Sequence, residues 1–190
     1  MRTKDLEKKN ALFEATISMV NEIGFAESSV SKIARRAGVS PSTLYVYHES
    51  KEALLISTYI DVKKKINHAT MEGFDDTLPI KEIFRKLWYN LFTYLAENQP
   101  YYEFAVQFMS SPHIEQVDLI KLHEELTPVA HVFINARDEG IIKNIDLRLL
   151  VAFVLSPISR LAGAKNNFKI VMDKENTEII FNMAWDAIKA

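Results

Sequence analysis

The sequence predicts an all-α protein, and three observations support this fold class. Only five glycines and six prolines interrupt the 190 residues, and between them apolar residues recur at intervals of three and four, as on one face of a helix. No Asn-Gly or Asp-Gly pair, the strongest short signal of a β-hairpin, occurs. Serine or aspartate stands just before several of the apolar stretches, where helix N-caps are expected.

Four short helices are expected in the first third of the chain, at about 12–23, 30–37, 41–48 and 51–66. The first stops at Gly24, which suits a left-handed C-terminal cap. Ser28 and Ser29 offer an N-cap for the second helix, and Ser50 caps the fourth. Pro41 occupies the first position of the third helix, where its missing N–H costs nothing.

The helices expected after the break at 73–79 are longer and more aromatic. They are predicted at about 83–97, 101–109, 114–139, 147–164 and 177–188. Pro128 lies inside the predicted 114–139 helix as a kink or break, and Pro157 interrupts the one at 147–164. Asp146 caps the latter.

Composition limits the class of protein. With 48% hydrophobic and 25% charged residues the chain is typical of a globular protein, and the absence of cysteine excludes disulfides and thiolate metal sites. The longest apolar run, at 149–155, is too short for a membrane helix, and the charged start lacks the apolar core of a signal peptide. We therefore expect a cytoplasmic protein without a membrane partner.

The charge is distributed unevenly along the chain. Residues 1–65 hold 11 basic and 8 acidic residues, a net charge of +3, whereas the remainder has a net charge of −5. A basic front end favours contact with a polyanion such as nucleic acid.

Residues 28–48 have the spacing of a helix-turn-helix, in which the second helix enters the major groove of DNA. Ala34 is small where the two helices approach, and Gly38 allows the turn between them. Val39 and Leu44 are expected to bury between the helices. This pattern predicts a DNA-binding module.

A longer pattern over about residues 10–56 is more specific. It comprises Ile-Ala-Arg-Arg-Ala-Gly-Val-Ser at 33–40, Thr-Leu-Tyr-Val-Tyr-His at 43–48 and Ser-Lys-Glu-Ala-Leu-Leu at 50–55. It closely resembles the DNA-binding domain of the TetR family of bacterial transcriptional regulators. The resemblance implies a helix-turn-helix domain at 1–52 and a helical effector-binding and dimerisation domain at 53–190.

The candidate DNA contacts are hydroxyl-bearing or small residues near the starts of the two helices. Ser29 and Ser31 can donate to phosphate, and Ser29 also suits an N-cap. Pro41, Ser42 and Thr43 begin the reading helix, where hydroxyls serve several bases and the threonine methyl suits a thymine methyl. The helix has no Arg, Asn or Gln for a bidentate base contact, so DNA shape is expected to contribute to recognition.

Four further candidates follow from the resemblance. The family's tyrosines imply that Tyr45 and Tyr47 position the reading helix on the DNA backbone, although core packing is an alternative for Tyr45. Lys51 matches the lysine that meets a phosphate. His48 stands where phenylalanine is usual, which leaves open whether it contacts DNA or packs inside.

For the C-terminal part, the resemblance implies a homodimer formed through the last two long helices and a pocket for an unknown small-molecule effector. The candidate lining residues are Trp88, Phe92, Phe104, Phe108, His131 and Arg137. Most large apolar residues here must nevertheless be core. The histidine spacing lacks the pattern of a metalloprotease, so neither a metal nor a cofactor is expected.

The sequence thus predicts a transcriptional regulator that binds a palindromic operator as a dimer, and the resemblance to the TetR family implies that it is a repressor. No enzyme motif is found, neither a nucleophile elbow nor a phosphate-binding loop. Two rival functions remain: an architectural or site-marking DNA-binding dimer without an effector, and a helical scaffold for other proteins.

Overall fold

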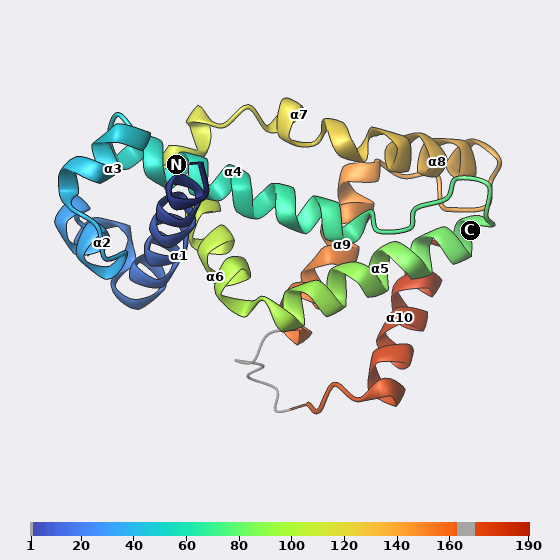
Figure 1. Cartoon of the computed structure of the whole chain (residues 1–190). Coiled ribbons are helices and arrows are strands. Elements are labelled where there is room, and N and C mark those ends of the chain that lie inside the picture. Colours follow the sequence, from blue (N-terminus) through green and yellow to red (C-terminus); the bar gives the residue numbers. More distant parts are fainter. Residues whose placement is uncertain (1, 163–169) are drawn as a thin grey trace. The chain divides into compact units, whose positions relative to one another are not determined.

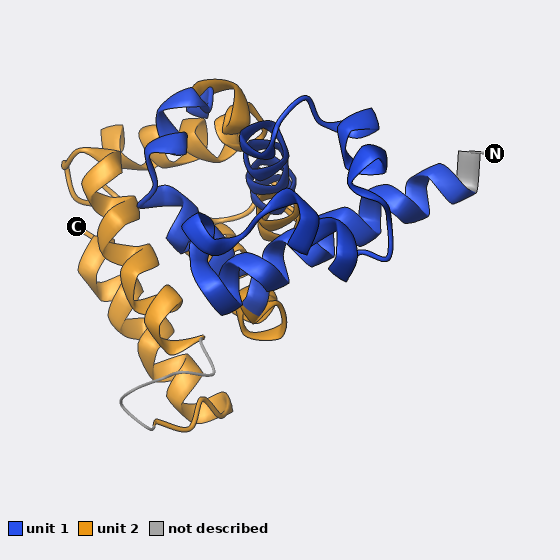
Figure 2. Ribbon diagram, turned by 90° about the vertical axis from the view of Figure 1, so that its left-hand side faces the viewer, with its two compact units in different colours: residues 1–64, 100–119 blue, residues 65–99, 120–190 orange. Residues whose placement is uncertain are grey.

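The computed structural model describes residues 2–162 and 170–190, and within them the all-α prediction is confirmed. These residues form ten α-helices and two short 3-10 helices, with a single isolated bridge between Ile142 and Lys189 in place of any sheet (Figure 1). The chain divides into two compact units, coloured separately in Figure 2. Unit 1 comprises Met1–Lys64 and Pro100–Leu119, and unit 2 comprises Lys65–Gln99 and Ile120–Ala190.

Unit 1 begins with three helices that pack in succession, α1 (Arg2–Glu27), α2 (Val30–Arg36) and α3 (Pro41–Tyr47). Gly24 interrupts α1 with a φ of 75°, a conformation that costs a glycine little, so the predicted stop is a kink. The core between the helices is small and aliphatic: it consists of Leu12, Ala15, Met19, Ile33, Leu44 and Leu54. Burial of these side chains holds the short helices, which are too short to be stable alone.

The rest of unit 1 comes from the first part of α4 (Lys51–Thr70) and most of α6 (Gln99–Met109). The ring of Tyr59 on α4 stacks on Phe108 of α6, with centroids 4.3 Å apart. Asn21 of α1 donates to the carbonyl of Pro100 over 2.8 Å. These contacts join α6 to the N-terminal helices although it lies far away in the sequence.

Unit 2 is built around α5 (Ile80–Glu97), against which α8 (Thr127–Asp138), α9 (Leu147–Leu161) and α10 (Lys174–Ile188) pack. Its core is aromatic: the Phe84 ring lies 5.8 Å from both Phe181 and Trp185, measured between centroids. The N-cap residues Asp146 and Asp173 accept hydrogen bonds from the first turns of α9 and α10.

Two predictions for the C-terminal helices are wrong. The 114–139 segment is not one helix: a 3-10 turn at Pro112–Gln116, α7 (Leu119–Leu122) and a second 3-10 turn at Glu124–Leu126 precede α8. Pro128 lies in the first turn of α8, which begins at Thr127, instead of kinking a longer helix, because its fixed φ suits that turn.

Pro157 does not interrupt its helix. It lies inside a continuous α9, where the carbonyl that loses its partner is that of Phe153, on the exposed side of the helix. The predicted end of this helix at Ala164 lies outside the described residues. The last helix begins at Lys174, three residues before the predicted start.

Candidate nucleic-acid interface

Helices α2 and α3 form the helix-turn-helix that the sequence predicts. Ser29 caps α2 by accepting a hydrogen bond from the backbone N–H of Lys32, and Ser40 caps α3 by accepting one from Thr43. Gly38 has a φ of 68° in the turn, and Val39 donates to the carbonyl of Ala34 over 3.0 Å. The turn geometry therefore follows from local residue chemistry.

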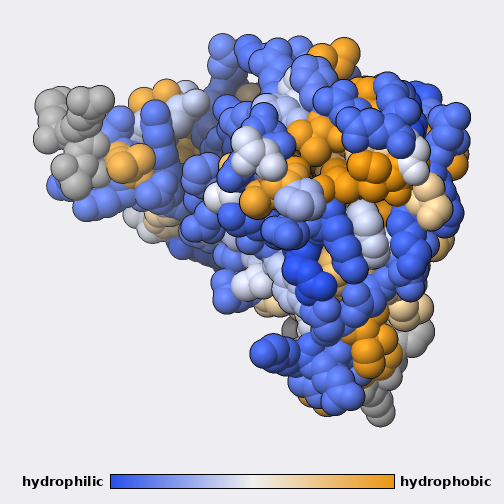
Figure 3. Space-filling model, turned by 90° about the vertical axis from the view of Figure 1, so that its right-hand side faces the viewer, coloured by the Kyte–Doolittle hydropathy of each residue, from blue (hydrophilic) through white to orange (hydrophobic). Residues whose placement is uncertain are grey.

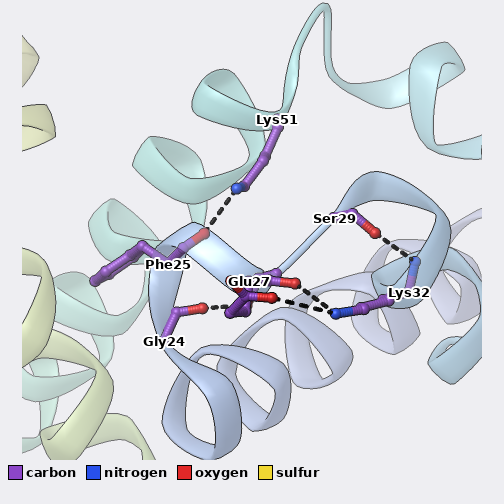
Figure 4. Close-up of polar contacts among 7 residues, drawn as sticks. Gly24, Phe25, Glu27, Ser29, Lys32 and Lys51 are labelled. Atoms are coloured by element: carbon purple, nitrogen blue, oxygen red, sulfur yellow. Dashed lines mark hydrogen bonds and ion pairs between the residues drawn. The ribbon is translucent and has the colours of Figure 1, made fainter.

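Polar contacts fix the helix-turn-helix to its neighbours (Figure 4). The ammonium of Lys51, at the start of α4, donates to the carbonyl of Phe25 over 2.7 Å, and that of Lys32 donates to the carbonyl of Glu27 over 2.9 Å. Arg36 at the end of α2 forms a bidentate pair with Glu22 of α1, and this pairing lowers the pKa of Glu22. The orientation of α2 is thus set from both of its ends.

One face of α3 is exposed and the other is buried. Pro41, Ser42, Tyr45 and Val46 are exposed, whereas Leu44 is fully buried. At 100° per residue the four exposed positions fall within one arc of about 140°. We call these four residues the reading stripe, because a helix-turn-helix presents such a face to the major groove.

Two predicted DNA contacts lie off the reading stripe. The hydroxyl of Thr43 is 2.9 Å from that of Ser40, inside the capping arrangement. The hydroxyl of Tyr47 donates to Asp5 of α1, which raises the pKa of Tyr47, and Lys9 lies over its ring. Both side chains are half-buried, so their contact with DNA stays a prediction. Tyr45, by contrast, is 55% exposed, which disfavours the core alternative for this residue.

His48 ends α3 and is half-buried. Its Nδ1 lies 3.2 Å from the hydroxyl of Ser57 on α4, and burial lowers the pKa of the ring. Packing against α4 therefore occupies one side of this residue, while contact with DNA stays a prediction.

The remaining residues predicted to contact phosphate differ in the hydrogen bonds that they make within the protein. Ser31 is exposed on α2, Ser29 is engaged as a cap, and Lys51 donates to Phe25. Sequence reasoning missed Val46, which is 76% exposed on the reading stripe. Helical periodicity could have identified it. If Leu44 and Tyr47 face inward, positions 42 and 46 lie together on the outer side of the helix.

Two family models match the chain. The model for bacterial regulatory proteins of the tetR family matches residues 12–58, and the model for the tetracyclin repressor-like C-terminal domain matches residues 79–189. The chain belongs to the TetR family.

Full-length relatives of the TetR family share the whole architecture. A TetR-family transcription regulator from Marinobacter aquaeolei is 32% identical, with a TM-score of 0.89 over 100% of this chain and 99% of that one. A putative TetR-family regulator from Vibrio parahaemolyticus is 27% identical, with a TM-score of 0.81 over 96% and 99%. An uncharacterized HTH-type transcriptional regulator from Haemophilus influenzae is 23% identical over the full length of both chains.

Membership of the TetR family makes this chain a DNA-binding transcription regulator. Members of the family bind DNA and typically act as dimers. Across residues 2–162 and 170–190, every helix is too short or too polar to cross a bilayer.

The predicted effector residues are divided between the units. Trp88 and Phe92 belong to unit 2, where their rings stack at 5.3 Å, while Phe104 and Phe108 belong to unit 1. All four are at least nine-tenths buried. On α8, His131 is exposed and Arg137 is paired with Asp138.

Trp88 has one unusual feature within unit 2. Its indole Nε1 is buried and has no hydrogen-bond partner among the described residues. An unsatisfied buried donor costs about 1–3 kcal/mol, so such groups are uncommon in folded proteins.

Proposed function

We propose that the chain is a homodimeric repressor that binds a palindromic operator through the reading stripe and is released by a small-molecule effector. The single observation that carries the DNA-binding part is the reading stripe itself. Its four residues are exposed on a short helix whose opposite side is fixed by Leu44, and they take no part in the core. Such a face is suited to the major groove.

A homodimer is supported by exposed apolar residues on the last two helices. Leu149 and Phe153 of α9 are 66% and 65% exposed and lie four residues apart, on one face of that helix. Ile179 and Met183 of α10 repeat this spacing. Figure 3 shows hydrophobic side chains exposed among hydrophilic ones on the face of the molecule that it draws. Exposed apolar patches of this kind mark interfaces, and a second copy places two reading helices on the two halves of a palindrome.

Fluorescence anisotropy tests DNA binding. The duplex comes from upstream of the protein's own gene, with a scrambled duplex as control, at low and near-physiological salt. If the protein recognises its own upstream region specifically, it should prefer the upstream duplex, and this preference should persist at the higher salt concentration.

Ser42→Glu puts a negative charge on the reading stripe and should weaken binding at least about tenfold. Ser110→Glu is the matched control on an exposed turn and should leave binding unchanged. Equal effects of the two variants contradict the proposal.

The effector is supported by the unpartnered indole of Trp88, which an acceptor atom of a ligand would satisfy. The competing function is an architectural dimer without an effector, which the close packing of Trp88 on Phe92 favours. A thermal-shift screen of small molecules separates the two, because a specific ligand raises the melting temperature. Trp88→Phe removes the donor and should reduce the shift produced by any such ligand. A screen without stabilising ligands favours the architectural dimer.

A further inference from the structure

Val46 is exposed where packing gives no reason for an apolar side chain. It is 76% exposed, and it is absent from the core that holds α1, α2 and α3 together. Valine is also a poorer helix former than the lysine or alanine usual at exposed helical positions. Neither packing nor helix propensity explains this residue, and a binding role is the alternative.

The neighbours of Val46 define the surface to which it belongs. Within the reading stripe, Ser42 and Val46 lie four residues apart in one row, and Pro41 and Tyr45 form the adjacent row. The hydroxyl of Tyr45 can exchange hydrogen bonds with base edges or phosphates. The hydroxyl of Ser42 lies 2.7 Å from that of Ser40, and on its exposed side it can make a further hydrogen bond to DNA. Val46 can offer only apolar contact, and its branched side chain stands one turn beyond the serine.

The major groove presents one apolar group at its base edges, the C5-methyl of thymine. The reading stripe holds no Arg, Lys, Asn or Gln, so it lacks the side chains that read guanine or adenine by paired hydrogen bonds. We propose that Val46 is a specificity-determining residue that contacts a thymine methyl, so that each operator half-site carries a thymine at one fixed position. This inference rests on the proposed function of operator binding.

The first step of the test is to select duplexes with the full-length wild-type protein from a randomised pool. Enrichment of a palindromic sequence establishes operator binding independently of Val46. A pool without enrichment overturns the proposed function, and the inference about Val46 falls with it.

In the second step, each thymine of the selected half-site is replaced in turn by deoxyuridine, which removes the C5-methyl group alone. At one position the wild-type affinity should fall about fourfold, the factor expected for one buried methyl group. Val46→Ala changes both protomers of the dimer, so on the thymine operator it should lose a similar factor for each half-site. The same variant should be insensitive to deoxyuridine at that position, because the methyl and the valine act as a pair.

Met109→Ala is the matched control, since it truncates another exposed apolar residue of unit 1, on α6. It should keep the wild-type affinity and the full response to deoxyuridine. The inference is overturned if no deoxyuridine substitution weakens the wild-type complex, or if the response persists undiminished in Val46→Ala. The latter result would assign the thymine to another residue of the stripe. Unchanged DNA affinity of Val46→Ala likewise overturns it and leaves a protein partner as the reason for the exposed valine.

Discussion

The helix-turn-helix of unit 1 and the aromatic core of unit 2 are stabilised by different chemistry. The first consists of two seven-residue helices, which depend on caps at Ser29 and Ser40 and on a small aliphatic core. Unit 2 depends instead on interlocking rings, with Phe181 lying within 6 Å of Phe84, Trp88 and Tyr89, centroid to centroid. In the first region, few residues are needed for stability, which leaves a whole helix face for recognition. In the second, both of the last two helices also expose large apolar residues.

The largest effect is expected from removing the ring at the centre of unit 2. Phe181 is fully buried, and Phe181→Ala should lower the free energy of unfolding by about 3–5 kcal/mol, the usual cost of an aromatic cavity. Urea unfolding followed by circular dichroism measures this. Asn182→Ala, at the adjacent exposed position, is the control and should have a small effect. Comparable losses in both variants would show that the aromatic core is not the main support of unit 2.

Separating the two copies should have the next largest effect. Phe153→Glu places a charge among the exposed apolar residues of α9 and should give a monomer in size-exclusion chromatography with light scattering. Operator affinity should fall about 100-fold or more, because the second half-site is then no longer bound within the same complex. Ile120→Glu is the matched control, since Ile120 is 85% exposed in unit 2 but lies outside α9 and α10. A dimeric Phe153→Glu protein would contradict the proposed interface.

The difference between the two regions also determines which of their features the sequence can predict. The caps at Ser40 and Asp146 and the turn at Gly38 depend on a few adjacent residues, so their local chemistry is sufficient. The break-up of residues 114–139 depends on where Pro128 falls relative to a helix start, and apolar spacing alone does not determine that.

In the candidate site, too, the sequence predicts what adjacent residues determine and misses what the three-dimensional packing determines. The family motif predicts α3 and its position, but it does not distinguish Val46, which is exposed, from Tyr47, which turns toward α1. Trp88 and Phe108 both lie in aromatic segments with the apolar spacing of a helix, so the sequence does not distinguish them. They nevertheless belong to different units. Only the three-dimensional arrangement separates them.

A smaller effect is expected at the cap of α3. Ser40→Ala removes the hydroxyl that accepts from the N–H of Thr43 and should destabilise the protein by about 1 kcal/mol. The hydroxyl of Thr43 also loses its partner, so the start of the reading helix becomes less well ordered. Urea unfolding and operator binding measure the two consequences. Ser110→Ala, at a turn after α6, is the control, and an equal loss there would mean that the cap has no special role.

The smallest effect concerns the pH dependence of stability at His48. Burial lowers the pKa of this ring, Lys9 acts in the same direction, and Asp61 opposes them. The unfolded chain therefore binds the proton at a higher pH than the folded protein does. The stability contributed by neutral His48 is present above the ordinary histidine pKa of about 6.5, and it is lost as the pH falls from there toward the lowered pKa of the folded state.

His48→Phe removes this titration while retaining a ring that packs against α4. Between pH 7.5 and pH 5.5 the wild type should lose more stability in urea unfolding than the variant does. His131→Gln, which removes an exposed histidine of unit 2, should behave like the wild type. The operator affinity of His48→Phe at pH 7.5 decides whether this residue contacts DNA or packs inside. Unchanged affinity indicates packing, whereas a loss of affinity indicates that the imidazole contacts the DNA. Equal pH dependence in wild type and His48→Phe would show that the half-buried ring is too well solvated to couple protonation to folding.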